Sequence, residues 1–259
     1  MNIALFTKEE IKQPLSLKDE RGKHIIKVLH KKEGETFDAG IINSKAGIAT
    51  ITKIDEEAIY FDFQSKSNGK PLHPVCLIVG FPRPIQLKRL FRDVAGLGIE
   101  KLYLCGTELG EKSYMDSNII VGGAGEKALL EGTVQAKSTH VPELKLFSSV
   151  GECLNFVKSE NQSYEKNLDK FKIKTILDNV KPKGSLFSFL QKELKSIDEK
   201  GINPYIYAAI GSERGWTDKE RELFEKEGFA SCSMGERVLR TETATTVATT
   251  LIMQSLEIL

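Results

Sequence analysis

The sequence lacks an excess of charge of either sign. Its 37 Lys and Arg residues are balanced by 36 Asp and Glu residues, which leaves a net charge of +1. RNA-binding proteins are usually more basic, so any RNA-binding surface in this chain has to arise from local segregation of charge. Long apolar runs are also missing: none approaches the length of a membrane span, and the N-terminus has no apolar signal segment. These absences predict a cytoplasmic protein with no membrane partner.

Patterns typical of metal sites and of nucleophilic catalysis are missing as well. The four histidines are isolated and neither H-E-x-x-H nor G-x-S-x-G occurs, so we expect no metal. Residues 106–113 read G-T-E-L-G-E-K-S, in which the second glycine comes one residue too early for the phosphate-binding G-x-x-x-x-G-K-S/T loop. No C-x-x-C pair occurs, and we expect buried, reduced thiols. These thiols belong to Cys76, Cys105, Cys153 and Cys232.

Length and composition suit two modest globular domains. Apolar residues make up 40% of the 259 residues and charged residues 28%, which is ordinary usage. The segment Ser65–Pro74, S-K-S-N-G-K-P-L-H-P, is polar and rich in turn-forming residues. We therefore predict domains at residues 1–70 and 71–259. Turn signals in the first domain separate short apolar runs, which predicts a small β-rich fold with strands at Thr36–Asp38, Ala46–Ile54 and Ala58–Gln64.

Apolar strand patterns alternate with amphipathic helix patterns in the second domain, which is typical of an α/β fold. The predicted strands are Val75–Phe81, Lys101–Cys105, Lys174–Leu177, Tyr205–Ile210 and Phe229–Cys232. The predicted helices are Gln86–Leu97, Glu126–Lys137, Leu186–Leu194 and one that begins near Thr241. Ser159–Lys170 is almost without apolar residues, so we expect a surface excursion there.

Two glycine-bounded motifs follow the last two predicted strands. G-S-E-R-G spans Gly211–Gly215, and M-G-E-R-V-L-R-T-E-T-A spans Met234–Ala244. After the first motif, Thr217 and Glu220 match the capping box of a helix start, and Thr241 is expected to cap the terminal helix. Such strand–loop–helix units place their loops at the carboxyl ends of parallel strands, where open α/β sheets bind ligands.

These motifs resemble the cofactor-binding trefoil knot of the SPOUT methyltransferases, and more narrowly the RsmE-type branch, which methylates uridine N3 of small-subunit ribosomal RNA. The branch usually shows G-P-E-G-G and then L-G-x-R-I-L-R-x-E-T-A. This chain departs from it at Ser212 and Arg214, where the family has Pro and Gly. Arg21–Lys32 and the later turn Gly34–Gly40 resemble the PUA-like RNA-binding domain that precedes the knot in the same family.

The resemblance implies an α/β fold in two parts. A C-terminal SPOUT domain with a mostly parallel sheet and a deep trefoil knot would follow a small β-rich, PUA-like barrel. It also implies a homodimer, in which the partner's surface completes each active site. The cofactor would be S-adenosylmethionine, held by main-chain atoms of the glycine-bounded loops and by apolar side chains around them. The expected contacts are Leu177, Ile210, Gly211, Glu213, Gly215, Met234, Gly235, Val238 and Leu239.

Candidate catalytic residues lie just before the terminal helix. Uridine N3 carries a proton at neutral pH, so its attack on a methyl group needs a base or a cation that stabilises the deprotonated ring. Arg240 is expected to donate to a uracil oxygen, and Glu242 or Glu213 to accept the proton. Alternatively, Arg240 and Glu242 form an ion pair, with Glu242 as a favourable charge in the first helical turn.

Two basic segments are candidates for RNA contacts. The first is Arg21–Lys32. Its residues Ile25, Val28 and Leu29 fall at helical spacing, so we expect them in the core and the lysines outside. The second lies on the helix at Gln86–Leu97 and just before it. An ordinary solvated helix face would account for either group. The predicted RNA-binding residues are Arg21, Lys23, Lys27, Lys31, Arg83, Lys88, Arg89 and Arg92.

Three hypotheses about function follow. The first is an S-adenosylmethionine-dependent uridine-N3 methyltransferase that acts on ribosomal RNA or on the small ribosomal subunit. The second keeps the knot but modifies another RNA or a ribose 2′-oxygen. The third, suggested by Ser212 and Arg214, is a ribosome-binding homologue that has lost catalysis.

Overall fold

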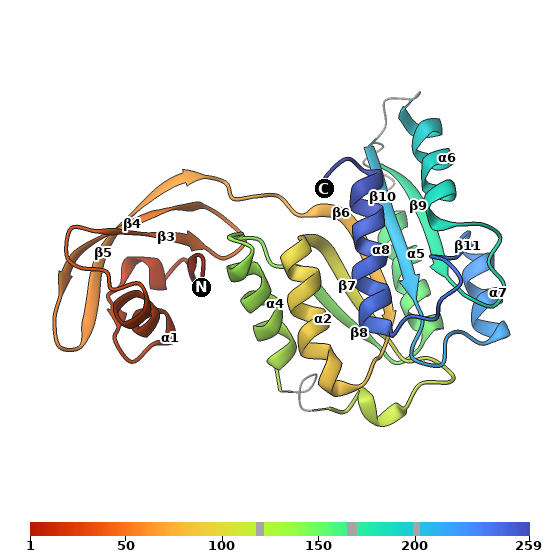
Figure 1. Ribbon diagram of the computed structural model, residues 1–259, viewed down its shortest axis with the longest axis horizontal. Helices are drawn as coiled ribbons and strands as arrows, with labels where there is room; N and C mark the ends of the chain where they lie inside the picture. Colours follow the sequence, from red (N-terminus) through yellow and green to blue (C-terminus); the bar gives the residue numbers. More distant parts are fainter. Residues whose placement is uncertain (118–121, 165–169, 199–202) are drawn as a thin grey trace. The chain divides into compact units, whose positions relative to one another are not determined.

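The computed structural model describes residues 1–117, 122–164, 170–198 and 203–259 (Figure 1). They form two compact units. The first contains Met1–Leu72 and Leu129–Val141, and the second contains His73–Ala128 and Pro142–Leu259. The first unit thus takes in residues 129–141, which lie well beyond the boundary expected at residue 70.

The first unit is built on a curled five-stranded sheet in the order β1-β3-β4-β5-β2. Its strands are β1 (Ala4–Phe6), β2 (Leu15–Ser16), β3 (Thr36–Ile41), β4 (Ala46–Ile54) and β5 (Ala58–Ser67). The three strands predicted here are confirmed, although β3 and β5 extend three residues further than expected. β1 runs parallel to β3, whereas the other neighbours are antiparallel. Alternate side chains of β4 and β5, such as Ile51 and Ile59, are buried in the core of this unit.

A short helical segment covers this core, and it corrects one expectation. After a 3₁₀ turn at Glu10–Lys12, α1 (Glu20–Lys23) continues into a π-helical turn, η2 (His24–Val28), closed by the bond from Leu29 N to His24 O at 2.9 Å. A π turn takes more residues than an α turn, so side chains after it rotate away from the face that an α-helix would present. Ile25 is fully buried as predicted, but Val28 and Leu29 are 59% and 42% exposed. The prediction that Val28 and Leu29 lie in the core is therefore wrong.

The second unit has a six-stranded, fully parallel sheet in the order β11-β9-β10-β6-β7-β8. Its strands are β6 (His73–Gly80), β7 (Ile99–Cys105), β8 (Glu143–Phe147), β9 (Lys170–Leu177), β10 (Asn203–Ile210) and β11 (Ala230–Cys232). The five predicted strands are confirmed, with ends shifted by one to four residues. β8 was not predicted. The α/β fold class with a mostly parallel sheet is confirmed.

Helices cover both faces of this sheet. α2 (Pro84–Leu97), α6 (Leu186–Asp198) and α8 (Thr241–Ser255) pack on one face, whereas α5 (Val150–Tyr164) and α7 (Asp218–Lys226) pack on the other. The connection between β7 and β8 contains a 3₁₀ turn (Lys112–Tyr114) and α4 (Ala124–Gln135). α5 continues to Tyr164, so the first residues of the segment expected to be a surface excursion are helical. Residues 165–169 of that segment lie outside the described residues.

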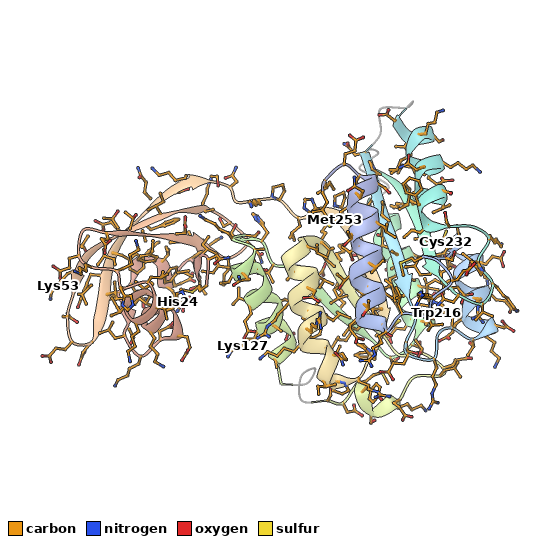
Figure 2. The ribbon with its side chains drawn as sticks, in the orientation of Figure 1. His24, Lys53, Lys127, Trp216, Cys232 and Met253 are labelled. Carbon is orange, nitrogen blue, oxygen red and sulfur yellow. The ribbon has the colours of Figure 1, made fainter. Side chains whose placement is uncertain are left out.

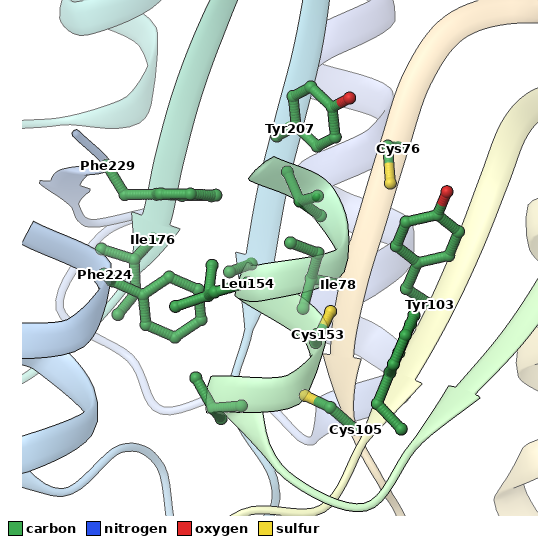
Figure 3. Packing of buried hydrophobic residues seen from close by; sticks show 14 of the residues in the cluster. Cys76, Ile78, Tyr103, Cys105, Cys153, Leu154, Ile176, Tyr207, Phe224 and Phe229 are labelled. Carbon is green, nitrogen blue, oxygen red and sulfur yellow. The ribbon is translucent and has the colours of Figure 1, made fainter. Parts of the chain in front are cut away.

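Alternate residues of β6 and β7 form the core under α5 and α7. Cys76 and Ile78 of β6 and Tyr103 and Cys105 of β7 point to this side and pack with Cys153 of α5 (Figure 3). All four cysteines are buried and free, which confirms the expectation for the thiols.

The terminal helix forms despite its β-branched residues. Thr245 and Thr249 donate their hydroxyls to the carbonyls one turn earlier, those of Thr241 and Thr245, at 2.8 and 2.7 Å. Their polar atoms are thereby satisfied inside the helix packing, and the predicted helix is confirmed. The expected cap at Thr241 is wrong, because Arg240 occupies the N-cap position and Thr241 is the first helical residue. The Thr217–Glu220 capping box at α7 is confirmed.

Strand β11 lies between the two ends of the segment that runs from Asp178 to Leu186. On one side it pairs with β9, and beyond that strand Asp178 N donates to Cys232 O at 2.9 Å. On the other side Leu186 N donates to Ser233 O at 2.8 Å. Both ends of this segment therefore bond to β11 or to the residue after it. The chain then continues as α8, which packs against β10 and β6 (Figure 1).

Candidate active site

A cavity of about 230 Å³ lies where β9, β10 and β11 end. Three loops surround it, at residues 177–180, 210–216 and 234–239, together with the start of α8. Its lining residues are Leu177, Asp178, Asn179, Val180, Ile210, Gly211, Ser212, Glu213, Arg214, Gly215, Trp216, Met234, Arg237, Val238, Leu239, Thr241 and Ala244. The sheet therefore brings together loops that are far apart in the sequence at the edge where α/β sheets bind ligands.

The structure gathers eight of the nine predicted cofactor residues around this cavity, and Gly235 is the exception. Gly235 has a backbone φ of 112°, and Gly215 has a φ of 72°. Both values lie in the region that residues with a Cβ rarely adopt, which accounts for glycine in both motifs. A Cβ added to Gly211 would lie 3.0 Å from the Cα of Gly215, so this tight turn also requires glycine at its start.

Three hydrogen bonds tie the loops to one another. The indole of Trp216, which is labelled in Figure 2, donates from Nε1 to Leu177 O at 3.1 Å and so joins the second loop to the first. The Thr241 hydroxyl donates to Gly211 O at 3.1 Å, which joins α8 to the second loop. The bond from Asp178 N to Cys232 O joins the first loop to β11, just before the third loop. The cavity is thus pre-formed by contacts within the chain.

Asp178 anchors the first loop through a largely buried ion pair. Its side chain is 3% exposed and accepts from Arg221 Nε at 2.7 Å and Nη2 at 3.1 Å. The backbone N–H groups of Val180 and Lys181 also donate to it. Burial raises the pKa of this carboxyl, but the hydrogen bonds from Arg221 and from the two N–H groups outweigh burial, so the pKa lies below its usual value of 3.8.

The two departures from the family motif have different surroundings. Ser212 is buried, its carbonyl accepts from Gly215 N at 2.9 Å, and its hydroxyl accepts from Thr107 at 2.9 Å. The turn is therefore closed and held in place although proline is missing. The Arg214 side chain is 69% exposed and lies 3.9 Å from Glu111.

The second basic segment lies beside this loop. Arg83 Nε is 3.0 Å from both carboxylate oxygens of Glu213, so a predicted RNA-binding residue contacts a predicted cofactor residue. Lys88, Arg89 and Arg92 are exposed on α2. The inward face of this helix is apolar and buried, as predicted.

Arg240 and Glu242 flank the cavity. The neighbouring residues Leu239 and Thr241 line it, whereas Arg240 is exposed and Glu242 is half-buried in the first turn of α8. Neither residue is among those that line the cavity, although each adjoins a lining residue in the chain.

The predicted RNA-binding residues of the first unit divide into two groups. All five N–H donors of Arg21 are taken, by Asp19, Glu10 and the Leu5 carbonyl, so its guanidinium has no donor left for a phosphate. Lys23 is paired with Glu20 at 2.9 Å. Lys27 is exposed, and Lys31 lies 4.0 Å from Glu35.

Several cavity residues have no counterpart among the predicted contacts, chiefly Asp178, Trp216 and Arg237. A signal existed for Asp178, which directly follows a predicted strand, and for Arg237, which belongs to the second glycine motif. Trp216 has no local signal, because its indole reaches a carbonyl 39 residues earlier in the chain. No group of His, Cys, Asp and Glu within the described residues could hold a metal ion. In the same part of the chain, no helix is both long and apolar enough to cross a bilayer.

The chain matches two family models. The model described as RNA methyltransferase domain matches residues 68–253, and the one described as RNA methyltransferase PUA domain matches residues 17–64. Ribosomal RNA small subunit methyltransferase E of Treponema pallidum is 39% identical over 258 residues, which cover 98% of this chain and 91% of that protein. Ribosomal RNA small subunit methyltransferase E 1 of Borreliella burgdorferi is 32% identical over 248 residues, with coverage of 96% and 95%.

Solved structures share this fold. A Ribosomal RNA small subunit methyltransferase E from Neisseria gonorrhoeae bound to S-adenosyl methionine superposes with a TM-score of 0.73 and 20% identity, over 99% of this chain and 98% of that chain. The putative methyltransferase Lpg2936 from Legionella pneumophila, in complex with the same cofactor, has a TM-score of 0.70, 20% identity and 98% coverage of each chain.

Proposed function

Because this chain belongs to the RNA methyltransferase family and carries that family's PUA domain, we propose that it transfers a methyl group from S-adenosylmethionine to N3 of a uridine in small-subunit ribosomal RNA. The observation that carries this proposal is the convergence of three knot loops, with eight of the nine expected cofactor contacts, around one cavity. The names of the relatives support the RNA substrate, and two cofactor-bound structures of the same fold support the cofactor.

The cavity suits an adenosyl group chemically. Its apolar walls offer contact area for a purine ring, and the positive-φ turns at Gly215 and Gly235 leave open space where side chains would lie. The wall side chains are Leu177, Ile210, Trp216, Met234, Val238, Leu239 and Ala244. When bound, S-adenosylmethionine supplies a sulfonium that makes its methyl group electrophilic. The protein then has to position the uridine and shield the site from water.

We propose that Glu242 is the base that accepts the proton from uridine N3. Both oxygens of the other candidate, Glu213, are engaged by Arg83, whereas Glu242 lies in the first turn of α8, next to the lining residue Thr241. Arg240 has a planar set of donors that suits a uracil oxygen and stabilises the deprotonated ring.

RNA contact is proposed at the exposed basic residues, without Arg21. The exposed ones are Lys27 in the first unit and Arg83, Lys88, Arg89 and Arg92 in the second, and the half-buried Lys23 and Lys31 are included with them. We further propose a homodimer that acts in the cytoplasm, on free RNA or on the assembled subunit.

Nucleoside mass spectrometry tests the reaction. Small subunits from a strain that lacks this protein are incubated with the protein and cofactor, and their RNA is digested. We expect 3-methyluridine to appear, whereas a new ribose methyl group would overturn the proposal. Calorimetry with S-adenosylmethionine tests the inactive alternative, because no binding at millimolar cofactor would favour a module without catalysis.

A further inference from the structure

The first unit contains a cavity that the proposed reaction does not use. Its volume is about 470 Å³, within the usual range of about 300–1,000 Å³ for ligand sites. It opens between the π-helical turn, β1, β3, β4 and the end of the 129–141 segment. All its lining residues belong to this unit.

The apolar part of this cavity reaches the surface. Ile25 and Phe37 are buried at 0% and 6% exposure, whereas Leu29 and Ile48 are 42% and 36% exposed. Val28, next to Leu29, is 59% exposed. The π turn brings Leu29 and Val28 outward, and such turns occur frequently at functional sites. Large exposed apolar side chains at the mouth of a cavity indicate a surface that a ligand covers.

The polar part of this cavity carries both cations and hydrogen-bonding groups. Lys31 and Lys137 line it, and Lys137 Nζ lies 2.7 Å from Asp38 Oδ2. An ammonium group has three donors, so one ion pair leaves donors for a phosphate. The Asp38 carboxylate can accept from N–H groups on a base edge. Asn2 also lines the cavity, and its amide is oriented by donation to Gln135 O at 2.6 Å.

We propose that this cavity is a subsite for one unpaired RNA nucleotide. Its base lies against Leu29 and Ile48, and its flanking phosphates lie on Lys31 and Lys137. Proteins recognise RNA mainly through splayed-out bases, which rest on flat or apolar side chains while lysines hold the backbone. The combination of an apolar cavity with a lysine-rich rim fits this chemistry. The proposal rests on the proposed function for its choice of RNA as the ligand.

Fluorescence of a base analogue tests the subsite in the full-length protein. The probe is a short single-stranded RNA with 2-aminopurine at its centre, whose emission rises when the base is drawn out of the stack with its neighbours. We expect Leu29→Ala to weaken binding about fivefold or more, because it removes apolar area that the base would cover. Lys31→Ala should lower the slope of log K against log salt by about 0.7, the loss of one phosphate contact. Ile48→Thr is a second, independent variant of the apolar wall.

Tyr60→Ala is the matched control. Tyr60 is 37% exposed on β5 and does not line the cavity, so its removal should leave binding unchanged. No rise in emission with wild-type protein would overturn the subsite and favour a protein ligand. Equal binding by wild type, Leu29→Ala and Ile48→Thr would also overturn the subsite. Absence of 3-methyluridine in the enzymatic assay, with a rise in emission that still depends on Leu29, would overturn the proposed reaction and leave the subsite standing.

Discussion

The ion pair between Asp178 and Arg221 offers the sharpest test of how the cofactor loops are held. Asp178→Asn keeps the size and shape of the side chain but removes its charge. Removal of one partner from a buried pair typically costs about 3–5 kcal/mol, because the remaining charge has no partner. Here Arg221 is 17% exposed and retains Asp218 at 3.1 Å. We therefore expect a smaller loss in the free energy of unfolding, about 2–3 kcal/mol.

A loss of this size lowers the melting temperature of a unit of this length by roughly 5–10 °C. The single tryptophan, Trp216, lies in the same unit beside the first loop, so its fluorescence reports the relevant transition. Asp178 also lines the cavity, so calorimetry should show weaker binding of S-adenosylmethionine. Asp218→Asn is the matched control, since it removes the other carboxylate on Arg221 at a site that is 66% exposed. It should change the stability by at most about 0.5 kcal/mol.

The pH dependence of stability gives an independent check. The folded-state pKa of Asp178 lies below its unfolded value of about 3.9, so the carboxylate stabilises the native protein fully at higher pH. This contribution disappears as the pH falls through the folded-state pKa, and the gap between wild type and Asp178→Asn should narrow below about pH 4. A gap that is absent at neutral pH, or that is matched by Asp218→Asn, would refute the reasoning.

Three further substitutions separate loop assembly from catalysis. Trp216→Phe leaves the buried Leu177 carbonyl without its donor and should destabilise this unit by about 1–3 kcal/mol and weaken cofactor binding, as measured by urea unfolding followed by circular dichroism and by calorimetry. Thr107→Val removes the hydroxyl that holds Ser212 and should raise the Kd for the cofactor severalfold while kcat at saturation stays the same; a changed kcat with unchanged Kd would contradict this role. Arg240→Ala should lower kcat about 100-fold or more with a cofactor Kd within twofold of wild type, and a kcat near the wild-type value would exclude Arg240 from catalysis.

Patterns local in sequence predicted much of this protein. The apolar runs that become β6 and β10 are buried on both faces of the sheet, and the capping box at Thr217 starts α7. Both signals depend on residues within a few positions of one another, so they can be read without knowledge of the fold. The glycine motifs likewise indicated the family from local sequence. Gly215 and Gly235 adopt backbone conformations that few other residues tolerate.

Other features were decided only by the tertiary structure. The hydrogen bond from Trp216 to Leu177 and the pairing of Asp178 with Arg221 join positions separated by about 40 residues, and no local pattern specifies such partners. The π turn overrode helical spacing and exposed Leu29. A network with Glu10, Asp19 and the Leu5 carbonyl used every donor of Arg21. Sequence thus determined which residues can form strands, turns and caps, because those preferences are local. The folded chain decided which of them meet, because contact depends on the path of the backbone through space.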